Sequence, residues 1–341
     1  STQCALVSLH DHLTQYLDDS STDGAMVISY DMSKAFDTLT CDVILQSLIQ
    51  CKFPHQFIHW IHSYLTYRKQ FVRVGCSASS TSMVTSGVPQ GSVLGPYLFA
   101  VAVSSFSSVN KDVHVVKYAD DFTFCFPIYK SSSNSHISYT HQKMLEWTSS
   151  INLALNKSKC KSLTIPKNKY CDIISLPGIV NVSSLTVLGV TFNHKLTWSS
   201  HFDNIIRNTS RRFYALRVLK PTLTKLVLRN VYYALIRSLL EYCTPLFLGA
   251  SLYDVKRLNA VQRRFHRLMC GHECVENCLP SLESRRRDLA LRFLKRITPY
   301  HVLYCELPRK SRTGRFILHR AELSDAVNRF FLLPARCITY Q

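Results

Sequence analysis

The stretch VVKYADDFTFCF, residues 115–126, decides the fold of this chain, because it sets two adjacent carboxylates within an apolar strand pattern. Asp120 and Asp121 follow a Val-Val pair and precede three phenylalanines at alternate positions, the period of a strand. The pattern predicts a strand, a two-residue tip and a second strand between residues 111 and 126. A buried carboxylate is costly unless something pairs with it, whereas an Asp-Asp pair taken alone is more often a turn exposed to water.

Another carboxylate, Asp31, ends a second apolar strand pattern, AMVISYD at residues 25–31. If the two strands are neighbours in one sheet, Asp31, Asp120 and Asp121 lie together. Such a cluster repels itself, and its pKa values rise unless divalent cations neutralise it. Oxygen ligands favour Mg²⁺, and two such ions about 3.5–4 Å apart can bind the attacking and leaving oxygens of nucleotidyl transfer. The exposed turn remains the alternative at this point.

The chain changes character near residue 200. Before it, predicted helices mix with predicted strands, which indicates an α+β sheet domain. The helices are expected at 4–17, within 35–50 with Thr40 or Asp42 as the cap, at 57–66 and at 138–153, and the strands at 25–31, 70–75, 111–126, 162–165 and 185–192. After it, helical spacing of apolar residues predicts a helical bundle, with helices at 203–219, 223–242 and 254–270.

The positive charge of the chain belongs to its C-terminal part. Residues 1–205 carry 15 Lys and Arg against 13 Asp and Glu, whereas residues 206–341 carry 26 against 9, within a net charge of +19. This excess indicates a polyanionic partner, most often nucleic acid. The candidate phosphate contacts are Arg211, Arg212, Arg263, Arg264, Arg267, Arg285, Arg286 and Arg287. The prediction concerns the cluster, since a single surface arginine is ordinarily only solvated.

The cysteines and the apolar runs argue against several other classes of protein. Thirteen cysteines without framework spacing predict reduced thiols rather than disulfides. The set His266, Cys270, His272, Cys274 and Cys278 lacks the repeated pairs of zinc modules, so zinc is not expected. The longest apolar run, around residues 94–103, is too short to span a bilayer, and no membrane segment is expected. The chain begins with Ser and shows no targeting pattern, so we expect an internal piece of something longer.

Five segments, in this order, resemble the palm motifs of reverse transcriptases, and most closely those of the non-LTR (LINE-type) retrotransposon branch. They are DMSKAFD at 31–37, SGVPQGSVLGPYLF at 86–99, YADD at 118–121, NLALNKSKCKSL at 152–163 and VLGVTFNHKLTW at 187–198. The resemblance implies a right-hand polymerase fold. Residues 1–24 would be a lead-in helix or remnant of the fingers, 25–200 the palm with part of the fingers, and 201–341 a basic helical thumb with a C-terminal extension.

The resemblance implies nucleotidyl transfer, in which a primer 3′-hydroxyl attacks the α-phosphate of a dNTP and pyrophosphate leaves. Asp31 and Asp120 would be the main ligands of two Mg²⁺ ions, which Mn²⁺ could replace. Asp121 would lie beside them at the primer end, and Met32 would add its backbone carbonyl. Lys159 would protonate the leaving pyrophosphate; a solvated surface lysine is the alternative reading.

Three further residues match positions that contact the incoming nucleotide in this family. Phe36, five residues after Asp31, matches the steric gate that selects dNTP over rNTP, with a core phenylalanine as the alternative. Gln90 and Gly91 match the PQG segment along the nucleotide and the templating base. A purely structural loop would also account for Gly91, but it would not account for Gln90.

Two functions remain open from the sequence. The first is an RNA-directed DNA polymerase core for retrotransposon copying, with an RNA template, a DNA primer and the product duplex as partners. The second is a catalytically inactive remnant or domesticated protein that only binds nucleic acid. The retained aspartates, together with Phe36 and Gln90, favour the first, although most of the fingers and any endonuclease or RNase H region are not recognisable. The resemblance implies an intracellular protein of the cytoplasm and nucleus.

Overall fold

The computed structural model describes residues 1–107, 110–130, 134–168, 171, 173–270, 279–297, 309–310 and 316–317. The chain divides into two compact units. Residues 21–182 form one of them, named here the sheet unit. Residues 1–20 and 183–341 form the other, the helical unit. The assignment of the chain to fingers, palm and thumb stays a prediction.

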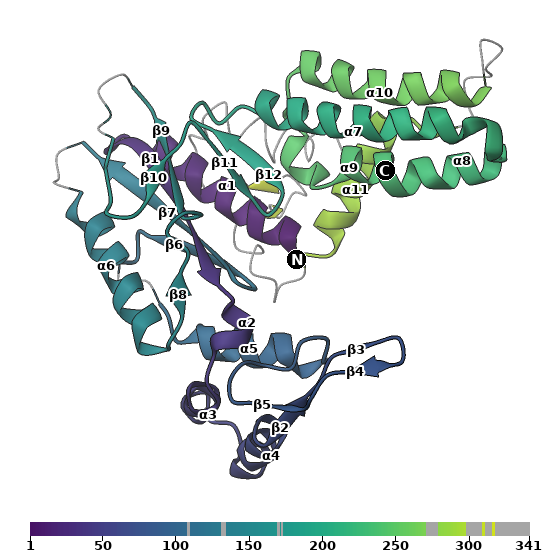
Figure 1. Ribbon diagram of the computed structural model, residues 1–341. Helices are drawn as coiled ribbons and strands as arrows, with labels where there is room; N and C mark the ends of the chain where they lie inside the picture. The colour runs from purple at the N-terminus through teal and green to yellow at the C-terminus, as the bar shows by residue number, and fades with distance from the viewer. Residues whose placement is uncertain are drawn as a thin grey trace. The chain divides into compact units, whose positions relative to one another are not determined.

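A six-stranded sheet lies at the centre of the sheet unit (Figure 1). Its strands are β1 (Thr22–Ser33), β6 (His114–Tyr118), β7 (Asp121–Tyr129), β8 (Ala154–Leu155), β9 (Lys161–Pro166) and β10 (Val180–Asn181). The order is β10-β9-β1-β7-β6, with β8 paired to β1, and every pair is antiparallel except β10 with β9. Antiparallel strands combined with helices confirm the predicted α+β class.

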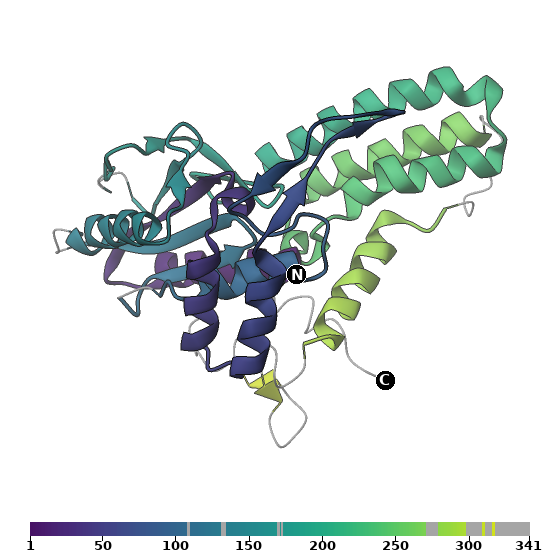
Figure 2. The same ribbon diagram turned by 60° about the horizontal axis from the view of Figure 1, so that its bottom comes forward.

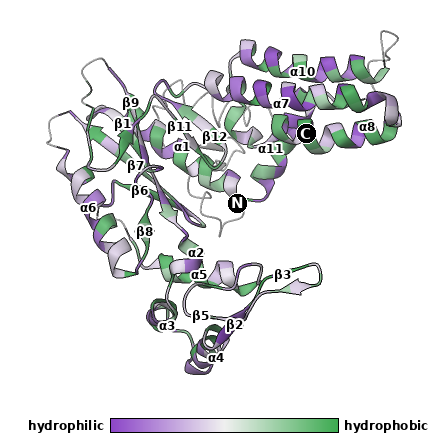
Figure 3. Ribbon diagram, in the orientation of Figure 1, coloured by the Kyte–Doolittle hydropathy of each residue, from purple (hydrophilic) through white to green (hydrophobic). Residues whose placement is uncertain are grey.

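Apolar side chains hold β7 in the middle of this sheet. Phe122, Phe124 and Phe126 are fully buried, as their alternate positions predict. The residues between them, Thr123 and Cys125, are buried as well. The strand is therefore covered on both faces rather than on one, which fixes its position firmly. Figure 3 shows mostly hydrophobic colours along these strands.

Five helices complete the sheet unit: α2 (Ala35–Thr38), α3 (Cys41–Gln50), α4 (His55–Leu65), α5 (Leu94–Ser104) and α6 (Ser135–Ser150). Of the two predicted caps of α3, Thr40 is the one used, because its side chain accepts a hydrogen bond from the backbone N–H of Val43. The sequence did not predict α5. Its Gly95-Pro96 pair resembles a helix breaker, but proline is tolerated in the first turn, where the missing N–H has no partner to lose.

Four short strands form a two-stranded arm between α4 and α5 (Figure 2). β2 (Arg68–Gln70) pairs with β5 (Ser82–Val84), and β3 (Arg73–Val74) pairs with β4 (Ser77–Ala78). The predicted strand at 70–75 is therefore confirmed in part, at Gln70 in β2 and at Arg73–Val74 in β3.

The helical unit contains α1 (Thr2–Asp18), β11 (Ser184–Val187), β12 (Val190–Asn193), α7 (Ser199–Leu219), α8 (Lys225–Tyr232), α9 (Ser238–Glu241), α10 (Leu252–Cys270), α11 (Leu282–Lys295), β13 (Arg309–Lys310) and β14 (Phe316–Ile317). The predicted single strand at 185–192 is wrong. Leu188 and Gly189 adopt positive φ angles of 46° and 82°, which turn the chain into the β11–β12 hairpin.

The predicted helix at 223–242 is interrupted by a π-helical segment, η2 (Tyr233–Arg237). The guanidinium of Arg212 on α7 donates a hydrogen bond of 2.6 Å to the carbonyl of Leu235 within this segment. Insertions of this kind leave backbone carbonyls without helical partners, and Arg212 supplies a donor. Among the residues that the structure describes, no helix has the length and apolar character needed to cross a membrane.

Candidate active site

The strand register brings the sequence-predicted carboxylates together. Asp31, near the end of β1, is the direct antiparallel partner of Asp121, the first residue of β7. Tyr118 pairs with Asp121, so the tip of the β6–β7 hairpin consists of Ala119 and Asp120. Ala119 takes a left-handed φ of 53° to make this tight turn. Directly opposed residues share one face of a sheet, so Asp31 and Asp121 present their side chains on the same side.

The neighbouring carboxylates affect the proton affinity of Asp121. Partial burial raises the pKa of Asp121 above its usual value, and the negative charges of Asp120 and Asp31 raise it further. Lys159 acts in the opposite direction. Its Nζ lies 3.4 Å from Oδ2 of Asp31, with the lysine side chain 65% exposed and the aspartate side chain 29% exposed. The predicted repulsive cluster is therefore present, with one ammonium as its counter-charge.

The donor set at this edge of the sheet suits a hard cation, because it consists of carboxylate oxygens. In the described parts of the chain, however, no group of three or more His, Cys, Asp or Glu side chains is placed to hold a metal ion. The backbone brings Asp31, Asp120 and Asp121 to one place, and the side chains would have to rotate to chelate an ion together.

The NKSK turn is attached to β1 by backbone contacts. The N–H of Asn156 donates to the carbonyl of Asp31 over 2.8 Å, and the N–H of Lys159 donates to the carbonyl of Asn156 over 2.9 Å. This chain of bonds places Lys159 beside Asp31. Met32 pairs with Leu155 of β8, and its side chain is buried in the core. A metal contact of its carbonyl stays a prediction.

Phe36 is half-buried between the sheet and the loop that carries PQG. Its ring stacks on Phe99 of α5, with the ring centroids 4.4 Å apart. The N–H of Val88 donates to the carbonyl of Phe36, and the N–H of Gly87 donates to that of Leu39, each over 2.8 Å. Gly87 has a φ of +78°, and a Cβ there would lie 2.8 Å from both Asp37 Cα and Phe36 O. Glycine is therefore required for this close approach.

Gln90 and Gly91 lie at the exposed tip of the same loop. The side-chain amide of Gln90 donates a 2.7 Å hydrogen bond to Oδ1 of Asp37. Thr40 caps the following helix, α3, so Asp37 is free to orient Gln90. Gly91 has a φ of +78° with open space around it, so nothing of the protein crowds its backbone.

Arg68 at the start of the arm was not predicted as a site residue. Its Nη2 donates to the carbonyls of Ser86 and Gly87 over 3.0 and 2.5 Å, and its Nε donates to the carbonyl of Leu65 over 2.9 Å. One guanidinium therefore links the end of α4 to the PQG loop. No spacing in the sequence signals such a contact, because it depends on the direction of backbone carbonyls.

An aromatic column along α4 was missed as well. Phe53, Phe57, Trp60 and Tyr64 form successive ring pairs with centroid distances of 5.3, 5.9 and 6.2 Å. Trp60 is 54% exposed. The spacing of four, three and four residues marks one helix face and could have revealed the column. The sequence contains no Asp or Glu between residues 43 and 111, and Arg68, Lys69 and Arg73 follow on the arm. Exposed rings beside cations suit unpaired bases.

The triple arginine at 285–287 does not form a common exposed cluster. Nε and Nη2 of Arg285 donate to the carboxylate of Glu241 over 3.1 and 3.0 Å, and Arg237 donates to Glu241 as well. Arg286 is buried. Arg285 is thus bound to Glu241 and Arg286 is enclosed, so we restrict the proposed phosphate contacts to Arg287 and the other exposed arginines.

The remaining candidate arginines lie on two neighbouring helices. α7 and α10 run side by side in Figures 1 and 2. Arg211 and Arg212 on α7 are exposed, as are three arginines of α10: Arg263, Arg264 and Arg267. Of the cysteine and histidine set at 266–278, residues 271–278 lie outside the described residues.

Comparisons with known proteins agree with this geometry. The family described as "Reverse transcriptase (RNA-dependent DNA polymerase)" matches residues 3–192. The "RNA-directed DNA polymerase from mobile element jockey" of Drosophila melanogaster is 27% identical, over 78% of this chain and 31% of its own length. The "Probable RNA-directed DNA polymerase from transposon X-element" of the same organism is 25% identical, over 96% of this chain and 36% of its own length. The chain thus spans about a third of these curated relatives.

Among solved structures, the apo telomerase from Candida tropicalis is 15% identical, with a TM-score of 0.42 over 77% of this chain and 44% of that chain. The telomerase from Candida albicans in complex with a fragment of telomeric RNA is 13% identical, with a TM-score of 0.38 over 86% of this chain and 51% of that chain.

Proposed function

Because this chain belongs to the reverse transcriptase (RNA-dependent DNA polymerase) family, we propose that it forms the polymerising core of a non-LTR retrotransposon enzyme. The resemblance predicted from the palm motifs is confirmed by the family match and by relatives from mobile elements. Reverse transcriptases generally use divalent metal ions and a nucleic-acid template. The observation that carries the proposal is the pairing of Asp31 with Asp121, which sets Asp120 at the adjoining tip.

In the proposed reaction, Asp31 and Asp120 would hold two Mg²⁺ ions, and Asp121 would support the site at the primer end. When bound, the ions would supply positive charge that offsets the negative charge of the triphosphate and of the attacking 3′-oxygen of the primer. The carboxylates fit this task because their mutual repulsion, expressed in the raised pKa of Asp121, favours a cation between them. The residues act chiefly by positioning and by charge neutralisation.

Lys159 is proposed to serve the leaving group. Its ammonium now pairs with Asp31 at the exposed edge of the site. The side chain is long and largely exposed, so its Nζ could turn from Asp31 towards the phosphates and give its proton to the departing pyrophosphate.

Selection of the nucleotide is proposed to rest on Phe36 and Gln90. The stack on Phe99 and the backbone bond from Val88 hold the Phe36 ring in place, so that it can exclude a ribose 2′-hydroxyl. Gln90, oriented by Asp37, is proposed to lie along the nucleotide and the templating base.

The template is proposed to approach over the aromatic column of α4 and the basic arm, which belong to a stretch of sequence without Asp or Glu. The exposed arginines of α7 and α10 are proposed to contact phosphates of the primer–template duplex.

A second candidate function is nucleic-acid binding without catalysis. It is favoured by one observation: the described side chains of His, Cys, Asp and Glu form no group placed for a metal ion, while Lys159 already neutralises Asp31.

Primer extension on an RNA template with Mg²⁺ or Mn²⁺ decides between the two. We expect incorporation by the wild-type chain, its loss in Asp120→Asn, and equal RNA binding by both. Glu146→Gln, which removes an exposed carboxylate of α6, should extend normally. RNA binding without any extension by the wild-type chain would support the second function and eliminate the first.

A further inference from the structure

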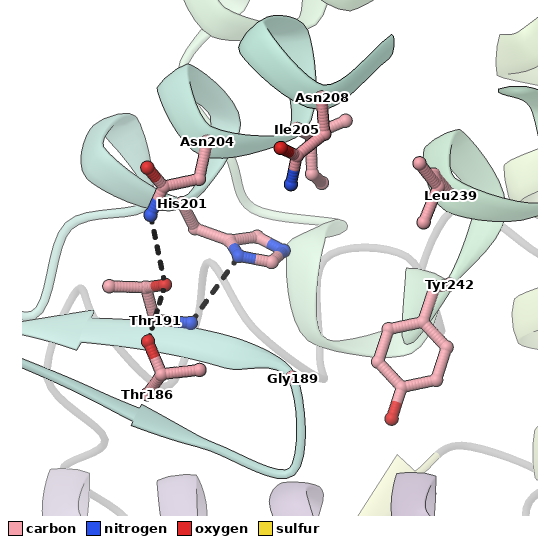
Figure 4. A pocket seen from close by; sticks show the side chains of 9 residues that line it. All are labelled: Thr186, Gly189, Thr191, His201, Asn204, Ile205, Asn208, Leu239 and Tyr242. Carbon is pink, nitrogen blue, oxygen red and sulfur yellow. Dashed lines mark hydrogen bonds between the residues drawn. The ribbon is translucent and has the colours of Figure 1, made fainter. Parts of the chain in front are cut away.

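The helical unit contains a cavity of about 280 Å³ between the β11–β12 hairpin, α7 and the segment around Tyr242 (Figure 4). Pockets for drug-sized ligands are typically about 300–1,000 Å³, so this one has room for a small ring. No residue that lines it is charged. Its floor is the hairpin, and its opposite walls are the side chains of α7 and the ring of Tyr242.

His201 on α7 places an unpaired hydrogen-bond donor in this cavity. The side chain is only 3% exposed. Its Nδ1 accepts a hydrogen bond from the backbone N–H of Thr191 over 3.3 Å, so the neutral ring carries its proton on Nε2. Nε2 is buried and has no hydrogen-bond partner. In Figure 4 it faces the open space of the cavity. A buried donor without an acceptor is costly, which points to an occupant that accepts.

The other polar groups of the walls largely satisfy one another. The hydroxyls of Thr186 and Thr191 lie 3.1 Å apart and share a hydrogen bond, and the amide of Asn204 donates to Thr191 over 3.3 Å. The hydroxyl of Tyr242 donates to the carbonyl of Leu188 over 2.7 Å. None of these groups forms a hydrogen bond with Nε2 of His201.

The residues that line the cavity indicate which kind of ligand it can bind. Burial lowers the pKa of His201 to about 4, so the ring is neutral at pH 7 and offers a donor rather than a charge. An anion such as phosphate would find no cation here and is disfavoured. Leu239, Ile205 and the ring of Tyr242 provide apolar surface, and the amide of Asn208 borders the same space.

We propose that this cavity binds a neutral planar ring that bears a carbonyl oxygen, the chemistry of a uracil or thymine base. The oxygen accepts the hydrogen bond from His201 Nε2–H, and the ring lies against the apolar walls. The occupant can be a free base or nucleoside, or a base of a polynucleotide that turns into the cavity. The proposal does not depend on polymerase activity.

Proton–nitrogen NMR of the full chain with labelled histidine tests this directly. Added uracil should shift the His201 Nε2–H resonance in a saturable way, and benzene, a ring without an acceptor, should not. Uridine and oligouridylate then separate the two sources, since only a base that can enter while attached to a chain allows the oligomer to bind. Absence of a saturable shift with every carbonyl-bearing probe, or an equal shift with benzene, would overturn the proposal.

Two variants complete the test. His201→Phe removes the donor and should abolish uracil binding, but it also leaves the N–H of Thr191 unpaired and can impair folding. Leu239→Phe instead fills the cavity from an apolar wall and leaves His201 intact. We expect it to weaken uracil binding at least tenfold with an unchanged circular dichroism spectrum. Leu226→Phe, on an exposed position of α8, is the matched control and should bind as the wild type does. Undiminished binding by Leu239→Phe would show that uracil binds elsewhere.

Discussion

Lys159 and Asp31 form an ion pair across the edge of the central sheet, with Nζ 3.4 Å from Oδ2. The two residues are 128 positions apart in the sequence, and backbone bonds from the NKSK turn to β1 bring them together. The ammonium neutralises the carboxylate that the proposed reaction assigns to a metal ion. If Asp31 binds Mg²⁺ as proposed, lysine and metal compete for it, and this competition leads to the first prediction.

Lys159→Ala should slow incorporation while strengthening metal binding. Loss of a general acid typically costs about 10²–10⁴-fold in rate. Removal of the competing ammonium should at the same time lower the Mg²⁺ concentration needed for half-maximal extension. Single-turnover primer extension over a Mg²⁺ series measures both. Lys143→Ala on α6 removes a lysine that pairs with Glu146, away from Asp31, and should change neither. A rate equal to that of the wild type would show that Lys159 is only a solvated surface lysine and not the general acid.

The raised pKa of Asp121 predicts a pH-dependent stability. Because the folded state holds the proton more tightly than the unfolded state, this carboxyl favours folding below the ordinary value of 3.8 and loses that contribution as the pH rises through its folded pKa. Asp121→Asn should therefore raise the melting temperature at pH 7. It should also reduce the loss of stability that the wild type shows as the pH rises above 3.8. The carboxyl is partly solvated, so we expect only a few tenths of a kcal/mol.

Mg²⁺ provides the control for that measurement, since a bound cation relieves the same repulsion. It should stabilise the wild type more than Asp121→Asn. Identical melting curves for the two proteins between pH 4 and 7, with and without Mg²⁺, would contradict the repulsive cluster.

Gly87→Ala should destabilise the sheet unit more than Gly91→Ala does. Both glycines have a φ of +78°, so alanine is strained at either position by about 1–2 kcal/mol. Only at Gly87 would the new Cβ also lie 2.8 Å from Asp37 Cα and Phe36 O. Urea denaturation of the two variants isolates this contact, because the backbone strain is common to both. Equal losses of unfolding free energy would mean that the loop can move away from Phe36.

Phe36→Val should admit ribonucleotides. The smaller side chain no longer fills the space of a 2′-hydroxyl, and we expect the ratio of rNTP to dNTP incorporation to rise by about tenfold or more. Phe99→Leu removes the stacking partner but keeps the Phe36 ring, so its discrimination should fall less. Competition assays with paired nucleotides measure both ratios. Unchanged sugar discrimination in Phe36→Val would show that Phe36 is only a core residue and not the steric gate.

The parts of the site that follow from strand pattern could be predicted, and those that depend on backbone direction could not. Asp31 lies near the end of one apolar strand and Asp121 at the start of another, and antiparallel pairing of two such strands as neighbours places these residues opposite each other. The hydrogen bonds from Arg68 to the carbonyls of residues 86 and 87 correspond to no periodic pattern in the sequence. The same holds for the unpaired Nε2 of His201, which emerges only once the β11–β12 hairpin and α7 are packed.

Trp60→Ala should weaken the binding of single-stranded RNA, because its exposed ring is the centre of the aromatic column on α4. Stacking of a base on an aromatic side chain contributes about 1–3 kcal/mol, so the dissociation constant should rise by roughly five- to 150-fold. The loss should be nearly independent of salt, whereas Lys69→Ala on the basic arm should reduce the slope of affinity against salt by about one. Ile49→Ala, a comparable truncation at an exposed position of α3, is the matched control and should bind normally. Fluorescence anisotropy with a short labelled RNA over a salt series separates the two effects. An unchanged affinity in Trp60→Ala would place the template elsewhere and leave the column free for a protein partner.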